Sequence, residues 1–454
     1  MRICSAKKMS SPVRIRSSQQ ERTLLASING LAVGRLMDVE GVWSFIYDPA
    51  WLDNAAAFPL SAALSLRQEA HTDTSSMRPV QWYFDNLLPE ENARGLLARD
   101  ANIDISDAFS LLTYYGAESA GSLTLGSAAD PEFGGEREER PLPDTELQRR
   151  IDNLPGISLV AEAPKRMSMA GAQHKLAVIY RPPALFEPVA ATPSTHILKP
   201  NHGDTDYRDS VMNELFAMRL ARSVGLDVPE VWRHYVPAPV YLIARFDRQA
   251  QQGVERLHAI DACQLLNLDR QYKYRAASME SLRQLADACS VPAATRLRLY
   301  NWFVFNLLVG NNDAHLKNLS FLVDHAGMRL APHYDMLSTA VYSTKAMGKD
   351  AWPNLPLSWP FQDLERFDQL SRAAVIAAGE ELGLAQPTAQ RLLDVQLKSV
   401  PKAAQAVLHE IEEENHRLLQ VQPGLAAVFG SEMRTARNIV GVIIKDMEIK
   451  LSVQ

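Results

Sequence analysis

The chain has 454 residues, which corresponds to roughly three domains of about 150 residues each. Its 46% hydrophobic and 22% charged residues are typical of a globular protein and exclude a collagen-like, low-complexity or wholly disordered chain. Because 47 Lys and Arg stand against 53 Asp and Glu, the formal net charge of −6 excludes a global basic field for nonspecific nucleic-acid binding and leaves room for local basic patches.

The three cysteines, Cys4, Cys263 and Cys289, are too scattered for a disulfide framework or a CxxC metal half-site, which favours a reducing cytoplasm. No apolar run reaches the ~18 residues needed to span a bilayer, so we expect no membrane contact. We expect residues 1–22 to form a flexible leader, and because this segment is basic and has no apolar core, we do not expect it to be a signal peptide. A transit peptide stays open, but a frayed terminus or a true start at Met9 is favoured.

The first unit, expected over residues 23–126, mixes strands and helices. Asn29-Gly30 lies between apolar runs and predicts a hairpin turn, and residues 43–47 continue the strand character. Helices are expected over two further segments, 80–97 and 104–112. We therefore expect a small sheet packed against helices.

A composition shift follows this unit. Pro, Gly and charged residues gather over 127–156, which predicts an exposed connector. Beyond it, an N-terminal lobe is expected over 157–243, with one strong helix among strand-like segments at 176–180, 196–198 and 240–246. After Met279 the pattern is nearly all helical, apart from one hairpin.

A buried helix, a polar loop and a hairpin follow one another in the second half. Residues 301–309 are apolar enough for a buried helix, which runs into a loop with Asp313 and Asn318 five positions apart. A hairpin over 319–331 then leads to Asp335. Protein kinases place a catalytic Asp, an Asn and a metal-binding Asp in this order, because phosphoryl transfer needs a proton acceptor and hard oxygen ligands for Mg²⁺.

Two other interpretations of this segment remain open. Asn311-Asn312-Asp313 also fits a turn or a helix cap, since Asn and Asp favour both. His315 and His333 lie near the carboxylates and permit a metal hydrolase, although no HExxH or comparable spacing supports it. The order of loop, hairpin and Asp favours the kinase interpretation.

A kinase also needs a lysine on an upstream strand, followed by a helix whose glutamate orients it. Lys199 ends the strand-like segment 195–199, and a helix that Asp209 or Ser210 would cap carries Glu214. Alone, Lys199 would be a solvated strand end and Glu214 a first-turn acid that favours the helix dipole. Their order along the chain makes the kinase interpretation the better one.

The small residues at 167–175 form a loop ahead of the strand at 176–180. Small residues let backbone amides approach phosphate oxygens. The segment is neither GxGxxG nor GxxxxGK[ST], so by itself it predicts an ordinary turn.

Taken together, these motifs resemble the HipA serine/threonine kinase toxins of bacterial toxin–antitoxin modules. The resemblance extends over nearly the whole chain. It is carried by 29–34, 59–61, 86–90, 116–121, 168–175, 195–199, 213–214, 245–248, 263–264, 273–274, 310–320 and 334–335. It implies an α/β (α+β), two-lobed, protein-kinase-like HipA fold, with an added N-terminal subdomain and a mostly helical C-terminal lobe over 244–454.

The resemblance also implies roles for individual residues. Asp313 would be the catalytic base, and Asn318 and Asp335 would hold Mg²⁺. Lys199, oriented by Glu214, would bind the phosphates of ATP. Further ATP-binding positions are implied at Ala170, Gly171, Ala172, Gln173, His174, Lys175, Ala244, Arg245, Phe246, His315, Lys317 and Tyr334.

Ser168 falls on the serine that the family autophosphorylates, an event that ejects the loop and stops catalysis. A serine that merely caps a turn is the alternative. Two positions depart from familiar relatives: Ala244 replaces a hinge glutamate, and Ile260 stands where an acid commonly precedes Asp261. The first matters little if the hinge holds adenine through its backbone, and the second puts any role of that acid in doubt.

The partner implied by the resemblance is HipB, a small helix-turn-helix antitoxin that binds operator DNA and recruits the toxin to it. The implied substrate is a translation component such as an aminoacyl-tRNA synthetase, whose identity this sequence does not reveal. A catalytically quiet regulatory subunit and a small-molecule phosphotransferase are the alternatives. Intact Lys199, Asp313, Asn318 and Asp335 argue against the first.

Overall fold

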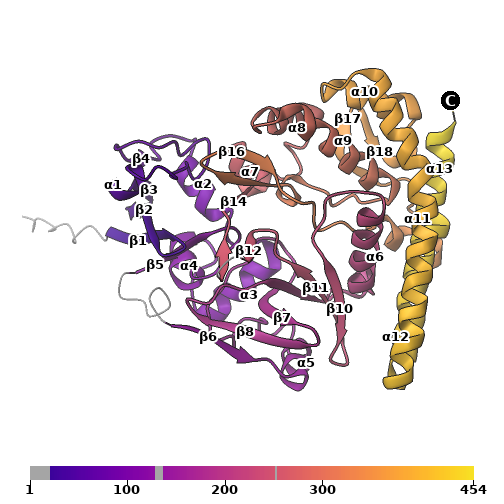
Figure 1. The fold of residues 1–454 in the computed structure, drawn as a ribbon, viewed down its shortest axis with the longest axis horizontal. Helices are drawn as coiled ribbons and strands as arrows, with labels where there is room; N and C mark the ends of the chain where they lie inside the picture. Colours follow the sequence, from indigo (N-terminus) through magenta and orange to yellow (C-terminus); the bar gives the residue numbers. More distant parts are fainter. Residues whose placement is uncertain (1–20, 128–135, 251–252, 454) are drawn as a thin grey trace, which may run out of the picture.

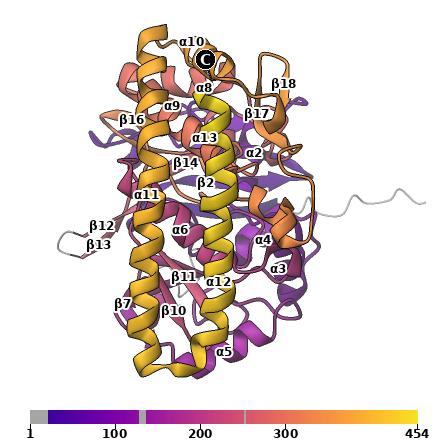
Figure 2. The same cartoon turned by 90° about the vertical axis from the view of Figure 1, so that its right-hand side faces the viewer.

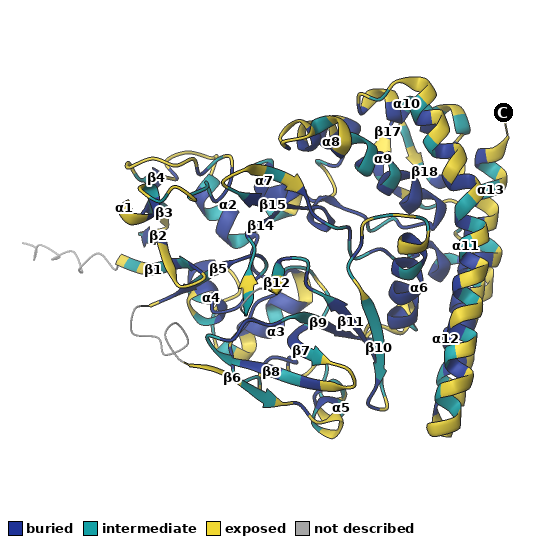
Figure 3. Ribbon diagram, viewed as in Figure 1, coloured by how far each residue is buried: buried dark blue, intermediate teal, exposed yellow. Residues whose placement is uncertain are grey.

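The computed structural model describes residues 21–127, 136–250 and 253–453. Most of the predicted leader, with Cys4 and Met9, lies outside these residues. The described chain forms an N-terminal subdomain, a sheet-rich N-terminal lobe and a mostly helical C-terminal lobe (Figure 1). One continuous cluster of buried apolar side chains runs through all of them. Buried residues, apolar and polar alike, are dark blue in the ribbon of Figure 3.

The N-terminal subdomain opens with an antiparallel sheet in the order β4-β3-β2-β1-β5. Its strands are β1 (Glu21–Ile28), β2 (Leu31–Val39), β3 (Val42–Tyr47), β4 (His71–Thr72) and β5 (Leu123–Gly126). The predicted turn joins β1 to β2, and Asn29 and Gly30 have φ values of 48° and 84°, as a type I′ turn requires. Alternate β1 side chains, such as Leu24 and Ala26, are buried, so one face of the sheet meets the core.

Three short helices pack on this sheet: α1 (Pro49–Leu52), α2 (Pro79–Asp85) and α4 (Ala108–Tyr115). Helix α3 (Glu91–Ala101) follows α2 along the chain. The helix predicted over 80–97 is therefore interrupted at residues 86–90. Pro89 lies in this break, and proline has no amide to donate to a helix ladder. The break brings residues 86–90 against the loop at 168–175, where Pro89 and Gly171 form a parallel β-bridge.

The N-terminal lobe is built on an antiparallel sheet in the order β10-β11-β9-β7-β8-β6. Its strands are β6 (Arg137–Pro141), β7 (Leu176–Arg181), β8 (Ala184–Ala190), β9 (His196–Pro200), β10 (Val231–Tyr235) and β11 (Pro239–Ala244). The strands predicted near 176, 196 and 240 are confirmed. The predicted strong helix is α6 (Ser210–Ser223), which packs on β10 and β11.

The predicted connector over 127–156 is wrong in its second half; residues 128–135 lie outside the described part. Strand β6 pairs with β8, and α5 (Asp144–Asp152) follows it. Arg150 of α5 is 2% exposed, and its guanidinium donates to the Glu187 carboxylate at 2.7 Å. The charge of this segment is thus paired inside the fold, which composition alone does not reveal.

The side chain that caps α6 is not the predicted one of Asp209 or Ser210. Asp209 has a left-handed backbone (φ 55°), and its carboxylate accepts hydrogen bonds from Ser431 and Thr435. The amide of Val211 donates instead to the side chain of Asn201 at 2.9 Å. A residue ten positions upstream therefore supplies the capping oxygen.

The C-terminal lobe contains the predicted buried helix and hairpin. The helix is α9 (Pro292–Leu308), and the hairpin is β15 (Ser320–Asp324) with β16 (Gly327–Leu330), extended by β14 (Ala259–Asp261). Shorter elements surround them: β12 (Arg248–Ala250), β13 (Val254–Arg256), α7 (Ala262–Leu265), α8 (Met279–Asp287) and α10 (Arg372–Glu381).

A second hairpin after Met279 was not predicted. It consists of β17 (Pro356–Phe361) and β18 (Leu364–Arg366). The indole of Trp359 donates a hydrogen bond to the backbone oxygen of Ala314, so β17 lies against the polar loop. The two prolines at the ends of the PLSWPF strand hid its strand character, because proline is disfavoured inside sheets.

The C-terminal side is formed by long helices. Helix α11 (Gln386–Val421) packs on α6 and α9, and α12 (Ala426–Asn438) runs back beside it before a π-helical turn and α13 (Lys445–Ser452), as Figure 2 shows. Among the described residues, no helix combines the length and the apolar character that crossing a membrane would require.

Substitution of Gly310, which follows α9, tests how closely the chain packs at this point. Its φ is +64°, and a Cβ there would lie 2.7 Å from side-chain carbons of both Ala340 and Ile443. We expect Gly310→Ala to lower the free energy of unfolding by about 2 kcal/mol in chemical denaturation. Gly430→Ala is the matched control, because its exposed site in α12 has open space and alanine favours a helix by up to about 1 kcal/mol. Equal stability of the two variants would contradict the assignment.

Candidate active site

A buried lysine joins the two lobes. Strand β9 places Lys199, which is 4% exposed, and its ammonium donates to both carboxylate oxygens of Glu214 in α6, at 2.7 and 3.0 Å. The same ammonium donates to Asp335 at 2.5 Å. Asp335 follows β16 and has a left-handed backbone (φ 58°). The predicted pair is thus formed, and a second carboxylate from the other lobe completes it.

The charges of this cluster support one another. Burial lowers the pKa of Lys199, but Asp335 and Glu214 outweigh burial and hold it above its ordinary value. Burial raises the pKa of Asp335, but Lys199 and Lys175 outweigh it and hold that pKa below its usual range. For Glu214 burial prevails and raises the pKa. Lys199 and Asp335 are therefore charged at neutral pH.

The polar loop after α9 is held by its own side chains. Asn318 lies in a 3₁₀ turn, and its amide nitrogen donates to the backbone oxygen of Asp313 at 2.9 Å. The side-chain oxygen of Asn311 accepts from the amide of Asp313 at 3.0 Å, and its nitrogen donates to Asn306 at 2.8 Å. The turn interpretation is thus correct for Asn311, and the same turn brings Asp313 and Asn318 together.

The Asp313 carboxylate meets a residue to which the sequence assigned no role. The hydroxyl of Tyr274 donates a hydrogen bond to Asp313, and Tyr274 is 44% exposed. Burial raises the pKa of Asp313 to about 6; the Tyr274 hydrogen bond opposes this shift and the charge of Asp335 adds to it. The carboxylate is therefore largely ionised at pH 7, with a proton affinity close to that of a general base.

Asn318 and Asp335 are suited to a magnesium ion. The Asn318 nitrogen binds the loop, which leaves its amide oxygen as the donor atom, and Asp335 supplies an ionised carboxylate; both residues line the same cleft. Mg²⁺ prefers such hard oxygens and usually completes its shell with water and substrate phosphates. Within residues 21–127, 136–250 and 253–453, no group of three or more His, Cys, Asp or Glu side chains is placed to hold a metal.

The two histidines of the hydrolase interpretation lie apart. His315 lines the cleft, where burial lowers its pKa to about 4 and its Nδ1 is buried with no hydrogen-bond partner among the described residues. His333 stacks on Trp302 with ring centroids 6.0 Å apart and does not line the cleft. Their positions therefore do not support a shared metal site.

The loop at 168–175 lies at the edge of this cleft, which has a volume of about 1070 Å³. It contributes Ala170, Gly171, Ala172, Gln173 and Lys175 to the lining. His174, which was predicted among them, instead lines a separate small cavity against the N-terminal subdomain. The loop is docked, because the amide of Glu90 donates to the backbone oxygen of Gly171 at 3.2 Å.

Ser168, just before this lining, is 1% exposed. Its amide donates to the backbone oxygen of Glu118 at 2.8 Å, and its hydroxyl lies 3.5 Å from the backbone oxygen of Leu87. The hydroxyl is therefore out of reach of any second molecule while the loop is docked.

The expected hinge also lines the cleft, with Ala244, Arg245 and Phe246. The amides of Ala244 and Arg245 donate to backbone oxygens within the N-terminal lobe, both at 2.9 Å, so an adenine would have to meet other groups of this segment. The Arg245 guanidinium is engaged in a buried ion pair with Asp247 at 2.7 Å. Phe246 stacks on Tyr334 with centroids 5.4 Å apart, which forms an aromatic wall.

Lys317 lines the cleft, but its ammonium is engaged by other residues. It donates to Asp261 at 2.6 Å and to the side chain of Asn86 at 2.8 Å. Nearby, Lys273 donates to Glu90 at 2.6 Å. Asn86 and Leu87 of the N-terminal subdomain thus form part of the cleft wall, a contact that no local pattern indicates.

Comparisons with known proteins assign the chain to a family. A family model described as the HipA N-terminal domain matches residues 24–126, and one described as the HipA-like C-terminal domain matches residues 167–407. The chain belongs to the HipA family. The resemblance found in the motifs is therefore confirmed.

Two curated relatives are similar over much of their length. The putative kinase Y4mE of Sinorhizobium fredii is 36% identical over 331 residues, which cover 69% of this chain and 76% of the relative. The serine/threonine-protein kinase toxin HipA of Shewanella oneidensis is 29% identical over 347 residues, which cover 72% and 77%.

A solved structure supports the fold. The Shewanella oneidensis MR-1 toxin–antitoxin complex of HipA, HipB and operator DNA contains a chain that superposes with a TM-score of 0.71 at 24% identity, covering 94% of this chain and 99% of the other. The predicted two-lobed, kinase-like α/β fold is thus confirmed.

The Lys199 ammonium, which Glu214 and Asp335 share, should contribute to the stability of the fold. Lys199→Met removes the cation that the buried Glu214 carboxylate shares with the partly exposed Asp335 carboxylate, so we expect a loss of about 3 kcal/mol in the free energy of unfolding. Lys199→Met with Glu214→Gln removes one of those charges and should recover part of the loss in denaturant titrations. A double variant no more stable than the single one would contradict the shared-cation arrangement.

Proposed function

We propose that this protein is an ATP- and Mg²⁺-dependent protein serine/threonine kinase that acts as the toxin of a bacterial toxin–antitoxin system. The observation that carries the proposal is the Lys199 ammonium held between Glu214 and Asp335 beside the Asp313–Asn318 loop, in one cleft. Membership of the HipA family supports the same activity.

In this proposal each residue of the cleft has a distinct task. Asp313 accepts the proton of the substrate hydroxyl, for which its ionised state at neutral pH is suited. Lys199 attracts the phosphates of ATP, and Glu214 keeps its ammonium in place. Asn318 and Asp335 hold Mg²⁺, which when bound neutralises negative charge on the phosphates.

The remaining cleft residues would surround the nucleotide. Backbone groups of the loop at 170–175 face its phosphates. Ala244 and Phe246 lie at the adenine end, where the stack of Phe246 on Tyr334 offers an apolar face. His315 and Lys317 shape the floor of the cleft, since the Lys317 ammonium is already engaged by Asp261.

The partner in this proposal is a HipB-like antitoxin that carries the protein to operator DNA. The related chain of known structure was solved with HipB and operator DNA, which supports this partner. A net charge of −6 fits, because the antitoxin would then supply most phosphate contacts. The protein substrate in this proposal is a translation component such as an aminoacyl-tRNA synthetase, as the resemblance to the family implies.

Asp313→Gln tests the activity. We expect ATP binding to persist in calorimetry while phosphoryl transfer to protein falls by about three orders of magnitude or more, because the hydroxyl is no longer deprotonated. Expression without an antitoxin should arrest growth for the wild type and not for this variant. Asp324→Asn, in the exposed turn of the β15–β16 hairpin, is the matched control. Transfer at the wild-type rate by Asp313→Gln would refute the assignment.

We also propose that Ser168 is an autophosphorylation site that switches the kinase off. A phosphate adds about −1.5 to −2 charge beside a loop whose amides would receive the phosphates of ATP, so the two anions compete. Ser168 is buried against Leu87 and Glu118, so the loop must leave its docked position before a neighbouring molecule can phosphorylate it. The reaction should therefore speed up with protein concentration.

Ser168→Ala tests this switch. We expect the variant to stay active longer than the wild type during incubation with ATP, followed by mass spectrometry and residual kinase activity. Ser158→Ala is the control, since Ser158 is also buried, has an unpartnered hydroxyl among the described residues and does not line the cleft. If phosphorylated protein bound ATP as tightly as unmodified protein, the switch would be disproved.

A further inference from the structure

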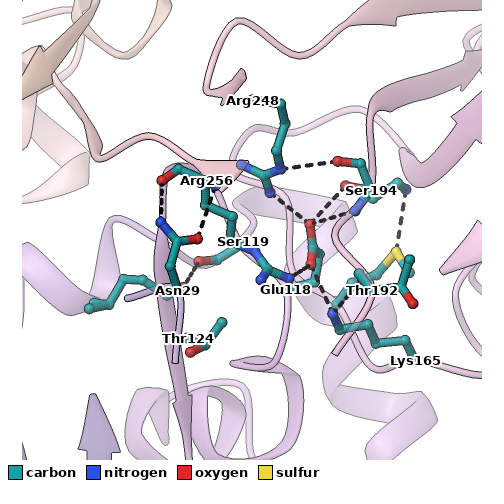
Figure 4. A network of polar contacts seen from close by, with 12 residues as sticks. Asn29, Glu118, Ser119, Thr124, Lys165, Thr192, Ser194, Arg248 and Arg256 are labelled. Atoms are coloured by element: carbon teal, nitrogen blue, oxygen red, sulfur yellow. Dashed lines mark hydrogen bonds and ion pairs between the residues drawn. The ribbon is translucent and has the colours of Figure 1, made fainter. Parts of the chain in front are cut away.

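The structure brings together two sequence motifs, one from the N-terminal subdomain and one that includes the hinge residues Arg245 and Phe246. Residues 116–121 follow α4 in the N-terminal subdomain, and residues 245–248 follow β11 at the hinge. They meet at the carboxylate of Glu118, which is 0% exposed (Figure 4). A buried carboxylate is costly unless it is paired, so its contacts determine what it does.

Glu118 accepts hydrogen bonds from cations of separate segments. They are Lys165 at 3.0 Å, Arg245 at 3.2 Å, Arg248 at 2.7 Å and Arg256 at 2.6 Å. The cations outweigh burial and hold the pKa of Glu118 far below its ordinary value. The Glu118 carboxylate is thus negatively charged, and it holds together segments that lie before and after the N-terminal lobe in the sequence.

The cluster depends on this one carboxylate. Asp247 pairs with Arg245 and Arg248, at 2.7 and 3.2 Å, so in these contacts two carboxylates face the four cations. Loss of the Glu118 charge would leave Arg245 and Arg248 with Asp247 alone, and Lys165 and Arg256 with no carboxylate partner among the described residues. Ser194 reinforces the arrangement, because its hydroxyl donates to Glu118 at 2.7 Å and accepts from Arg245 at 3.0 Å.

The contacts of Glu118 reach both ends of the cleft. Arg245 belongs to the hinge segment that lines the adenine end. At the other end, Lys165 and Ser168 lead into the loop at 170–175; the ammonium of Lys165 binds the Glu118 side chain, and the amide of Ser168 binds its backbone oxygen at 2.8 Å. A single residue of the N-terminal subdomain therefore fixes the two segments between which a nucleotide would lie.

We propose that Glu118 is a positioning residue for nucleotide binding, through which the N-terminal subdomain holds the hinge and the phosphate-facing loop in their binding positions. The inference rests on the proposed kinase function, since it presumes that ATP occupies this cleft. Glu118 itself does not touch the nucleotide; it acts through Arg245 on one side and through the backbone of Ser168 on the other.

Glu118→Gln tests this role, because glutamine keeps the size of the side chain and removes its charge. Binding of a non-hydrolysable ATP analogue with Mg²⁺ to the full-length protein is measured by calorimetry. We expect the dissociation constant to rise by about tenfold or more, and the KM for ATP to rise while kcat at saturating ATP stays within about threefold. Glu118→Asp, which keeps the charge, should recover part of the affinity.

Glu187→Gln is the matched control. Glu187 is also 0% exposed and paired with two arginines, Arg140 and Arg150, but it lies in β8 and does not line the cleft. We expect it to lose stability and to keep ATP affinity within about twofold of wild type. Equal affinity losses in both variants, or none in Glu118→Gln, would overturn the inference.

If Glu118→Gln does not fold, Ser194→Ala tests the same role with a smaller change. It removes one neutral donor from Glu118, so a smaller rise of about threefold in the dissociation constant is expected, and unchanged affinity would overturn the inference. A wild-type protein that bound no ATP analogue would instead overturn the proposed kinase function, and this inference with it.

Discussion

The burial of the Lys199 ammonium between two carboxylates is the interaction on which the cleft depends. An unpaired charge at this depth would cost several kcal/mol, so the chain must present both Glu214 and Asp335 to it. This requirement fixes β9, α6 and the segment after β16 relative to one another. The Asp313–Asn318 loop then follows, since the β15–β16 hairpin joins it to Asp335. The geometry of the site is thus a consequence of charge compensation between two lobes.

The same rule explains why the N-terminal subdomain is part of the cleft. Its carboxylates at Glu90 and Glu118 are buried against lysines and arginines of the lobes. Each pair is costly to break, because separation would leave charges without partners in a poorly solvated place. The subdomain therefore forms a wall of the site. Its buried glutamates fix the orientation of this wall, because an ion pair is more directional than an apolar contact.

The sequence predicted those features that local patterns encode. The Asn29-Gly30 turn, the buried helix α9 and the β15–β16 hairpin follow from turn chemistry and apolar runs. The order of Lys199, Glu214, Asp313 and Asp335 predicted that they share a cleft, because protein kinases place such residues in this order around one site.

Features that depend on residues distant in the sequence could not be predicted from local patterns. Asn201 as the cap of α6, β6 as an edge strand and Tyr274 on Asp313 each need a neighbour that only the folded chain supplies. His174 is a similar case: it stands within the predicted loop, yet its side chain turns to another cavity. Sequence adjacency fixes where a backbone goes more firmly than where a side chain points.

The cleft residues are spread over much of the sequence, which affects the order in which they become available during translation. Glu118 is synthesised early, whereas Asp313 and Asp335 leave the ribosome only after most of the chain has been translated. Because domains generally fold from the N-terminus during synthesis, we expect the subdomain and the N-terminal lobe to form before Asp313 and Asp335 are available. A chain that ends before residue 313 has Lys199 and Glu214 but lacks the proposed base Asp313 and the proposed magnesium ligands Asn318 and Asp335. In the proposed function, an incomplete chain therefore cannot transfer phosphate, and activity first becomes possible after Asp335 has been translated.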